Sequence, residues 1–219
     1  MARSSAARRL DEPQFEEHLE GPRFGGGVPP PPRPNLVIGS NAWVAVLVFI
    51  GAEIMFFAGL IGAFLVFRLG SPIWPPPFQP RLPVGITGAN TLILVASAVT
   101  MHLALRSVRA DALNRLIRML GATAALGGLF LLIQGFEWAR LLHFGLTLSS
   151  SVYGGLFYTL IGFHALHVIA ALVWLLVVLL QAQRGRFLRQ RHEGLQTCTM
   201  YWTFVVALWP VLYGLVYLY

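Results

Sequence analysis

Three residues in two long apolar stretches carry groups that can hold a proton or a metal. Glu53 is the single charged residue between Val44 and Phe67. His164 and His167 lie in the middle of 32 residues, Val152 to Gln183, that contain no Asp, Glu, Lys or Arg. Side chains three apart share one face of a helix, so both histidines are expected to face protein rather than lipid.

Two further polar groups, Gln134 and Glu137, are also three residues apart in an apolar stretch. A charged, unpaired carboxyl group at membrane depth costs several kcal/mol, so we expect each carboxyl group to be protonated or paired. Glu53 is then either a structural hydrogen-bond donor, or part of a proton relay or a bound-ion site, and contacts the histidine face or lipid. Glu137 lies nearer a membrane face, where Arg140 is a candidate partner.

The two histidines also allow a metal or haem interpretation. Imidazole rings at i and i+3 can bind one metal, and His102 offers a third ring from another stretch. However, the sequence has no HExxH motif, and its one cysteine, Cys198, lies in an apolar stretch as a small packing residue. A hydrogen-bonded structural pair is therefore favoured over a metal or haem site.

The composition indicates what must position these groups. The chain is 56% hydrophobic and only 11% charged, with a mean hydropathy of +0.67. These values exclude an ordinary soluble domain, and stretches of about 20 apolar residues predict membrane-spanning helices. The sequence predicts an all-α, polytopic membrane bundle of five helices, over residues 44–67, 86–105, 116–142, 152–183 and 195–219.

The arginines predict the orientation of the bundle. Only Arg68, Arg81 and Arg140 of the sixteen basic residues fall on one side of the five spans, and all the others fall on the opposite side. Arginine accumulates on the cytoplasmic side, so the N-terminus is predicted to be cytoplasmic and the C-terminus outside. This topology explains the net charge of +7 without nucleic acid as a partner.

The regions outside the spans are rich in Pro and Gly. Residues 1–42 have too little apolar content for a core and are predicted to form a disordered or extended cytoplasmic tail, ahead of a five-helix domain over 43–219. The loop after the first span is Pro-rich and carries Trp74, which suits a membrane interface. Trp74, Asn90 and Trp202 are predicted to contact lipid or to lie at an interface.

Six blocks of sequence, in order, give the chain a resemblance to a known family. They are AEIMFFAGL, WPP, NTLILVASAVT, LIQGFEW, VYGGLFYTLIGFHALHV and YWTF. Over Val44 to Tyr219 the chain resembles subunit III of the haem-copper terminal oxidases, the cytochrome c oxidase family. Glu53 matches the intramembrane glutamate of that family, and His164 and His167 match its paired histidines.

The resemblance implies a fold and a role. The family has seven helices, a pair and a group of five with a lipid-holding cleft between them, and this chain is similar to the group of five. Subunit III carries no haem or copper, which belong to subunits I and II. The resemblance implies that the chain packs mainly against subunit I, binds structural phospholipids and supports proton uptake during O2 reduction, in a bacterial inner membrane.

The chain departs from the family pattern at four positions near the ends of the last two spans: Ser150, Gln196, Thr203 and Val206 replace two acids, a histidine and an aspartate. Short relatives also accompany nitric oxide reductases and quinol oxidases. A subunit-III-like accessory protein of one of those complexes is therefore the alternative. A third interpretation, a self-contained haem or metal enzyme, would require ligands among the three histidines.

Overall fold

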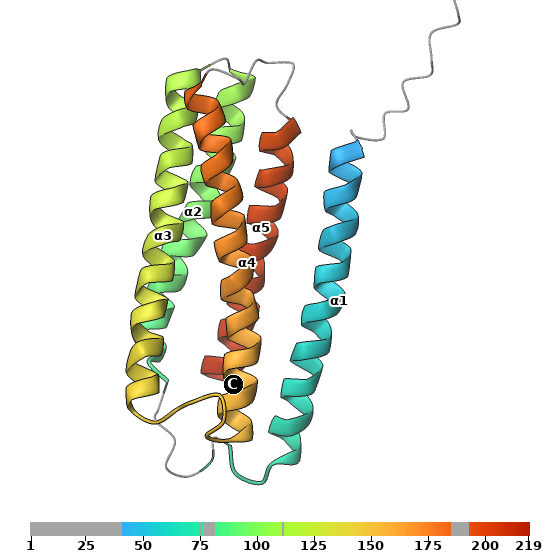
Figure 1. Ribbon diagram of the computed structural model, residues 1–219, viewed down its shortest axis with the longest axis vertical. Coiled ribbons are helices and arrows are strands. Elements are labelled where there is room, and N and C mark those ends of the chain that lie inside the picture. The colour runs from blue at the N-terminus through green and yellow to red at the C-terminus, as the bar shows by residue number, and fades with distance from the viewer. Residues whose placement is uncertain (1–40, 75, 77–81, 111, 185–192) are drawn as a thin grey trace, which may run out of the picture. The chain divides into compact units, whose positions relative to one another are not determined.

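The computed structural model describes residues 41–74, 76, 82–110, 112–184 and 193–219. In these residues every regular element is helical (Figure 1). The elements are α1 (Asn41–Gly70), α2 (Val84–Arg109), α3 (Leu113–His143), α4 (Val152–Gln183), α5 (Glu193–Tyr213) and a short π-helix, η1 (Gly214–Leu218). The proposed tail lies outside the described residues, except for its last two positions, which begin α1.

The prediction of five membrane-spanning helices is confirmed. Each of the five long helices contains an 18-residue window apolar enough to cross a membrane. The α4 helix has the predicted bounds, whereas α1, α2 and α3 extend beyond them at both ends. Hydropathy marks the part of a helix that crosses the hydrocarbon, and these helices continue past it. The predicted fifth span is α5, which contains Pro210, followed directly by η1.

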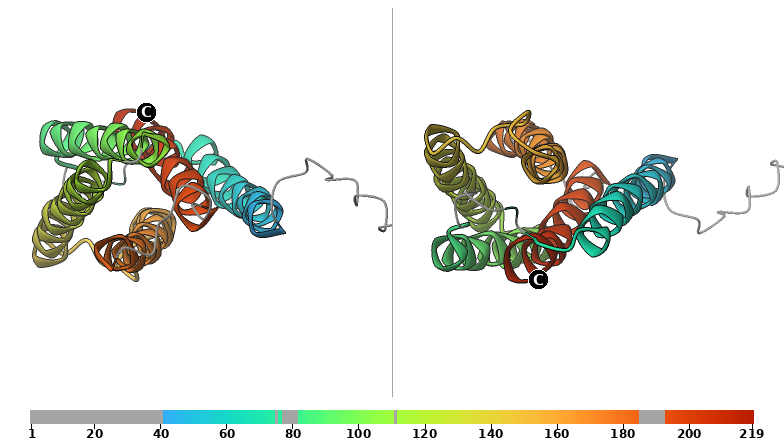
Figure 2. Two further views of the ribbon diagram at one scale, coloured as in Figure 1. Left: turned by 90° about the horizontal axis from the view of Figure 1, so that it is seen from above. Right: turned by 90° about the horizontal axis from the view of Figure 1, so that it is seen from below.

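Four of the helices form a ring. Each of α2, α3, α4 and α5 packs against two others of the four, in that order around the ring, and α5 closes it against α2. The α1 helix packs outside the ring, against α5 and α4 (Figure 2). A residue on α4 therefore faces the ring interior, the contact with α1 or the outside of the bundle, depending on its position around the helix.

The ring and α1 bury different amounts of side chain. Large aromatic residues fill the ring, and Trp202 and Trp209 are each only 1% exposed. In α1 only Ile50, Phe57 and Phe64 are buried. Their spacing of seven residues places them in one narrow stripe along the helix, because seven residues make almost two turns. The rest of α1 presents apolar side chains outward, as expected for a helix against lipid.

Two local features fix the end of the bundle where α3 joins α4. Gly145 has a φ of 88°, in the left-handed region that glycine adopts without strain. The side chain of Ser151 caps α4, because its hydroxyl oxygen accepts a hydrogen bond of 3.1 Å from the Gly154 N–H. The short turn between these residues sets the rotation of α4, and with it the direction of both histidines.

Candidate functional site

Glu53 of α1 and His167 of α4 meet where the two helices pack together. The Glu53 Oε2 atom lies 2.8 Å from the His167 Nε2 atom, and the two side chains are 13% and 16% exposed. The separation is that of a hydrogen bond, although the angles depart from those of a straight one. Of the two contacts left open for Glu53, the histidine face and lipid, the structure has the first.

The hydrogen bond of His167 to the backbone determines which of its nitrogens faces Glu53. The His167 Nδ1 atom lies 2.6 Å from the Phe163 backbone oxygen, which only accepts, so Nδ1 carries a hydrogen. The other ring nitrogen, Nε2, is the atom that faces Glu53 Oε2. The contact therefore places two groups that can exchange a proton side by side at membrane depth.

Aromatic rings surround the pair on the α1 side. The centroid of the Phe57 ring lies 5.2 Å from that of His167, and Phe56 lies 6.4 Å from it. Phe56 also packs edge-on against Phe163, with 5.1 Å between centroids. These rings make the surroundings apolar, which strengthens the electrostatic contact between Glu53 and His167 relative to the same contact in water.

His164 lies in a different environment, inside the ring. It is 1% exposed and stacks on Trp209, with ring centroids 5.1 Å apart and an interplanar angle of 25°. Neither of its nitrogens has a hydrogen-bond partner among the described residues. The Phe57 ring lies near both histidines, 6.5 Å from His164 and 5.2 Å from His167 between centroids, but their polar contacts differ. No group of three or more His, Cys, Asp or Glu side chains in the described part of the chain converges as metal ligands.

Gln134 belongs to a buried polar layer between α2, α3 and the C-terminal segment. Its Nε2 donates a hydrogen bond of 3.2 Å to the Tyr217 hydroxyl. Asn90 of α2 donates through Nδ2 to the Phe130 backbone oxygen at 3.1 Å, and Phe130 lies one turn before Gln134 on α3. The sequence alone did not indicate Tyr217 as a partner, since η1 determines the direction of that side chain. The two bonds join α2 to α3 and α3 to η1.

Glu137 has the partner suggested by its spacing. Its Oε1 atom lies 3.2 Å from Nη1 of Arg140, with the carboxylate side chain 5% exposed and the arginine side chain 49% exposed. The pair joins a buried carboxylate to the surface of α3. Glu137 therefore has an arginine at the bundle surface, and Glu53 has a histidine at a helix contact.

The three residues predicted at lipid or interface contacts divide into two groups. Trp74 is half-buried and packs edge-on against Phe64 and Tyr153. Asn90 and Trp202 instead lie inside the ring, each 1% exposed, and Trp202 Nε1 donates to the Ser97 hydroxyl at 3.2 Å. Proximity to a helix end suggested an interface for these two, but their side chains point to the helices next to them in the ring.

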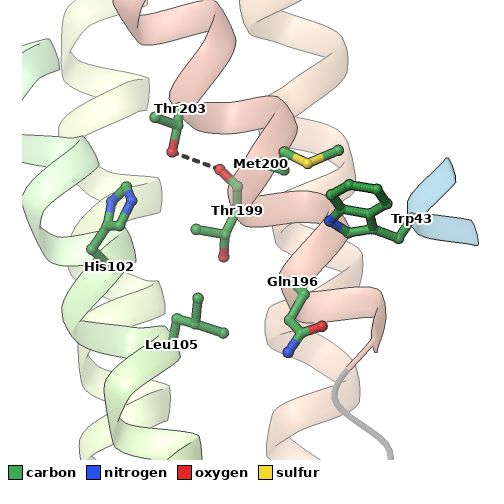
Figure 3. A pocket seen from close by; sticks show the side chains of 7 residues that line it. All are labelled: Trp43, His102, Leu105, Gln196, Thr199, Met200 and Thr203. Carbon is green, nitrogen blue, oxygen red and sulfur yellow. Dashed lines mark hydrogen bonds between the residues drawn. The ribbon is translucent and has the colours of Figure 1, made fainter. Parts of the chain in front are cut away.

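A pocket of about 450 Å³ opens at the other end of the bundle, where α1 and α5 begin and α2 ends (Figure 3). The lining mixes polar and apolar side chains, and consists of Trp43, His102, Leu105, Gln196, Thr199, Met200 and Thr203. Two features of the sequence point toward it. One is a histidine near the Arg-rich end of a span, and the other is a set of polar residues at spacings of three and four, which place them on one face of a helix: Gln196, Thr199 and Thr203.

Comparison with known proteins decides the family. The model of the family "Cytochrome c oxidase subunit III" matches residues 35–219. The chain belongs to this family. A protein of Synechocystis named cytochrome c oxidase subunit 3 is 37% identical over 174 residues, which are 79% of this chain and 73% of the relative. The resemblance seen in the sequence is thereby confirmed.

Two other relatives show how length varies in the family. A probable cytochrome c oxidase subunit 3 of Nocardia farcinica is 32% identical, and the match covers 84% of this chain and 89% of the relative. The cytochrome c oxidase subunit 3 of Locusta migratoria is 34% identical over 84% of this chain, but only 70% of the insect protein is covered. The described bundle thus matches most of a short relative and a smaller share of a long one.

Proposed function

We propose that this chain is the accessory subunit III of a respiratory haem-copper oxidase of the cytochrome c oxidase type. It packs against subunit I, in a complex that includes subunit II, and it lies in a bacterial inner membrane with its N-terminus in the cytoplasm. The family match and the names of the relatives support this assignment over a nitric oxide reductase. Haem and copper belong to the partner subunits, and this chain contributes lipid binding and support of proton uptake.

The observation that carries the proposed proton role is the contact between Glu53 and His167. A carboxyl group and an imidazole group 2.8 Å apart hold one exchangeable proton between them at membrane depth. The two side chains are 13% and 16% exposed where α1 meets α4, so the pair lies near the outer surface of the bundle, where a neighbouring subunit can contact it. Glu137, paired with the surface Arg140, lacks such a proton-accepting partner.

Affinity purification of the tagged full chain in mild detergent tests the accessory role. We expect a haem spectrum and O2 uptake in the eluate while the partner subunits are present, and their loss when the partners are stripped. A haem spectrum that stays with the isolated chain would contradict the assignment and make His102, His164 and His167 the candidate ligands.

Substitution of Glu53 tests the proton role. Glu53→Gln keeps a hydrogen-bonding group but has no proton to release, whereas Glu53→Ala removes the partner of His167 altogether. We expect both variants to lower sustained oxidase turnover, and only Glu53→Ala to destabilise the bundle, by about 1–3 kcal/mol. The measurements are O2 uptake by the purified complex over many turnovers and unfolding of the chain in bicelles.

The matched control is Glu137→Gln, which changes the other carboxyl group within the spans. It should leave sustained turnover at the level of the unsubstituted complex, because Glu137 pairs with Arg140 away from α1. Full turnover and full stability in both Glu53 variants would refute a role for this pair in proton uptake and in packing.

A further inference from the structure

We propose that the pocket where α1 and α5 begin and α2 ends binds a membrane quinol, an uncharged dihydroxy aromatic ring with an apolar tail. The ring of the quinol lies between His102 of α2 and Trp43 of α1, against α5. This binding is additional to the accessory role and requires only that the bundle lies in a membrane. It involves no oxidation of the quinol, so the site is one of binding alone.

His102 is a polar group that faces outward at membrane depth. It lies inside the part of α2 that can cross a membrane, Val84–Val108, and its side chain is exposed. A polar ring against hydrocarbon is unfavourable, so a polar partner is expected there. The His102 Nδ1 atom lies 2.8 Å from the Ala98 backbone oxygen, which only accepts, so Nδ1 carries a hydrogen. In the neutral imidazole, Nε2 is then an acceptor, and a hydroxyl group of the ligand is the partner that suits it.

The opposite side of the pocket supplies hydrogen-bond donors. Figure 3 shows His102 on one side and Trp43 on the other, with four residues of α5 between them: Gln196, Thr199, Met200 and Thr203. The hydroxyl groups of Thr199 and Thr203 donate to backbone oxygens one turn earlier in α5. The donors for a ligand on this side are therefore the amide of Gln196 and the indole N–H of Trp43.

The remaining lining suits the face of an aromatic ring. Leu105 and Met200 contribute apolar surface, and a thioether packs favourably against an aromatic ring. The volume of about 450 Å³ falls in the range of about 300–1,000 Å³ found for small-molecule sites. A dihydroxy ring places one hydroxyl at His102 and the other at Gln196 or Trp43. An alcohol with one hydroxyl group at one end would satisfy only one side of the pocket.

The absence of fixed charge in the lining favours a neutral ligand. Among the described residues that line the pocket there is no Asp, Glu, Lys or Arg, and Arg106, although exposed nearby on α2, is not one of them. A phosphodiester would bring a negative charge that no lining residue pairs, whereas a quinol is uncharged. Gln196 and Thr203 are two of the positions at which the chain departs from the family pattern, in place of an acid and a histidine. The neutral lining is therefore a feature of this chain.

Exposed apolar residues beside the pocket provide a surface for the tail of the quinol. Val99 and Val95 precede His102 by three and seven residues, so all three lie on one face of α2. The two valines are 57% and 41% exposed. On α5, Val211 follows Thr203 by eight residues and is 56% exposed. The tail thus extends from the pocket toward the middle of the bundle, and the ligand enters from the hydrocarbon of the bilayer.

Photolabelling of the purified complex in nanodiscs tests this binding. The probe is a ubiquinol analogue with a photoreactive diazirine in its tail, the competitor is decylubiquinol, and labelled peptides of this chain are identified by mass spectrometry. His102→Phe keeps a ring but removes the acceptor. Thr203→Phe fills the pocket, at a half-buried position whose hydroxyl bonds its own helix. The matched controls are His143→Phe on α3 and Val173→Phe on α4, since both residues are exposed outside the pocket.

We expect label in peptides of α2 or α5 that decylubiquinol displaces. At a probe concentration below saturation, labelling should be about tenfold lower in the two pocket variants and unchanged in the controls. Equal labelling in all five proteins would overturn the proposal. Displacement of the label by added phosphatidylglycerol would assign the pocket to phospholipid instead, and no label in the complex would assign it to a partner polypeptide. The haem spectrum of the same sample reports whether the oxidase partner is present, so failure of the oxidase assignment is distinguishable from failure of the quinol site.

Discussion

His164 and His167 lie one turn apart on α4 in two different regions of the molecule. Inside the ring, His164 is 1% exposed, stacks on Trp209 and makes no hydrogen bond with the described residues. At the contact with α1, His167 touches a carboxylate through one nitrogen and a backbone oxygen through the other. One residue type therefore serves as a packing ring in the first region and as the partner of a carboxyl group in the second.

The difference follows from how the two regions are stabilised. The ring interior is filled by large aromatic side chains, and the indoles of Trp202 and Trp209 donate to hydroxyl groups within the ring. The α1 contact has one stripe of buried apolar residues and one polar pair. We therefore expect substitutions in the ring to change mainly the stability of the fold. Substitutions at the α1 contact should change mainly the contact between Glu53 and His167.

The largest effect is expected for Trp209→Ala. The Trp209 ring packs on His164 and on Phe130, and its Nε1 donates to the Thr91 hydroxyl at 2.9 Å. Truncation leaves a cavity and removes the indole donor to Thr91, so we expect a loss of about 3–5 kcal/mol in the free energy of unfolding, measured by steric trapping in bicelles. Trp209→Phe keeps most of the packing and should lose much less. Equal losses in the two variants would show that packing does not dominate the ring.

Two glycines, Gly127 in the ring and Gly59 in α1, are expected to differ in the stability that each loses on substitution, by less than the loss in Trp209→Ala. A Cβ atom at Gly127 in α3 would lie 2.6 Å from the Trp202 ring, whereas one at Gly59 in α1 would meet nothing within 4 Å. Trp202 is buried and hydrogen-bonded to Ser97, so it has little freedom to move. We expect Gly127→Ala to cost about 1–3 kcal/mol in the same unfolding assay, and Gly59→Ala to cost nothing.

Gly128, next to Gly127 on α3, provides the control, because a Cβ atom there also meets nothing within 4 Å. Gly128→Ala should leave the stability unchanged. A loss as large as that of Gly127→Ala would attribute the effect to the α3 backbone and not to the contact with Trp202.

The sequence predicted the five helices because the requirement for about 20 apolar residues is local. Glu53 was identifiable for the same reason, as a lone charge in an apolar stretch. Its partner was not, since His164 and His167 both lie on α4 and only the packing of α1 outside the ring selects His167. The rotation of one helix against another is a tertiary property that spacing along one chain segment does not contain.

The buried polar layer and the pocket illustrate the same limit. The bond between Gln134 and Tyr217 joins residues 83 positions apart and depends on the π-helix after Pro210. Asn90 and Trp202 sit near helix ends in the sequence, yet their side chains face the ring interior. The pocket forms only because α1 and α5 begin, and α2 ends, at the same height along the bundle. Each feature combines segments whose mutual placement only the folded bundle determines.

The smallest effect is expected where the end of α1 meets the C-terminal residue. The guanidinium carbon of Arg68 lies 4.5 Å from the centroid of the Tyr219 ring, a cation–π contact between α1 and the segment after the ring helices. Tyr219 is 62% exposed, so the contact should contribute only about 0.5–1 kcal/mol. A double-mutant cycle of Arg68→Gln and Tyr219→Leu in the unfolding assay isolates this term. Arg68→Lys, which keeps the positive charge, should retain part of it. A coupling energy as large as the loss in Trp209→Ala would mean that α1 is held as firmly as the ring itself, and would contradict the division of the molecule into a packed ring and a weakly attached helix.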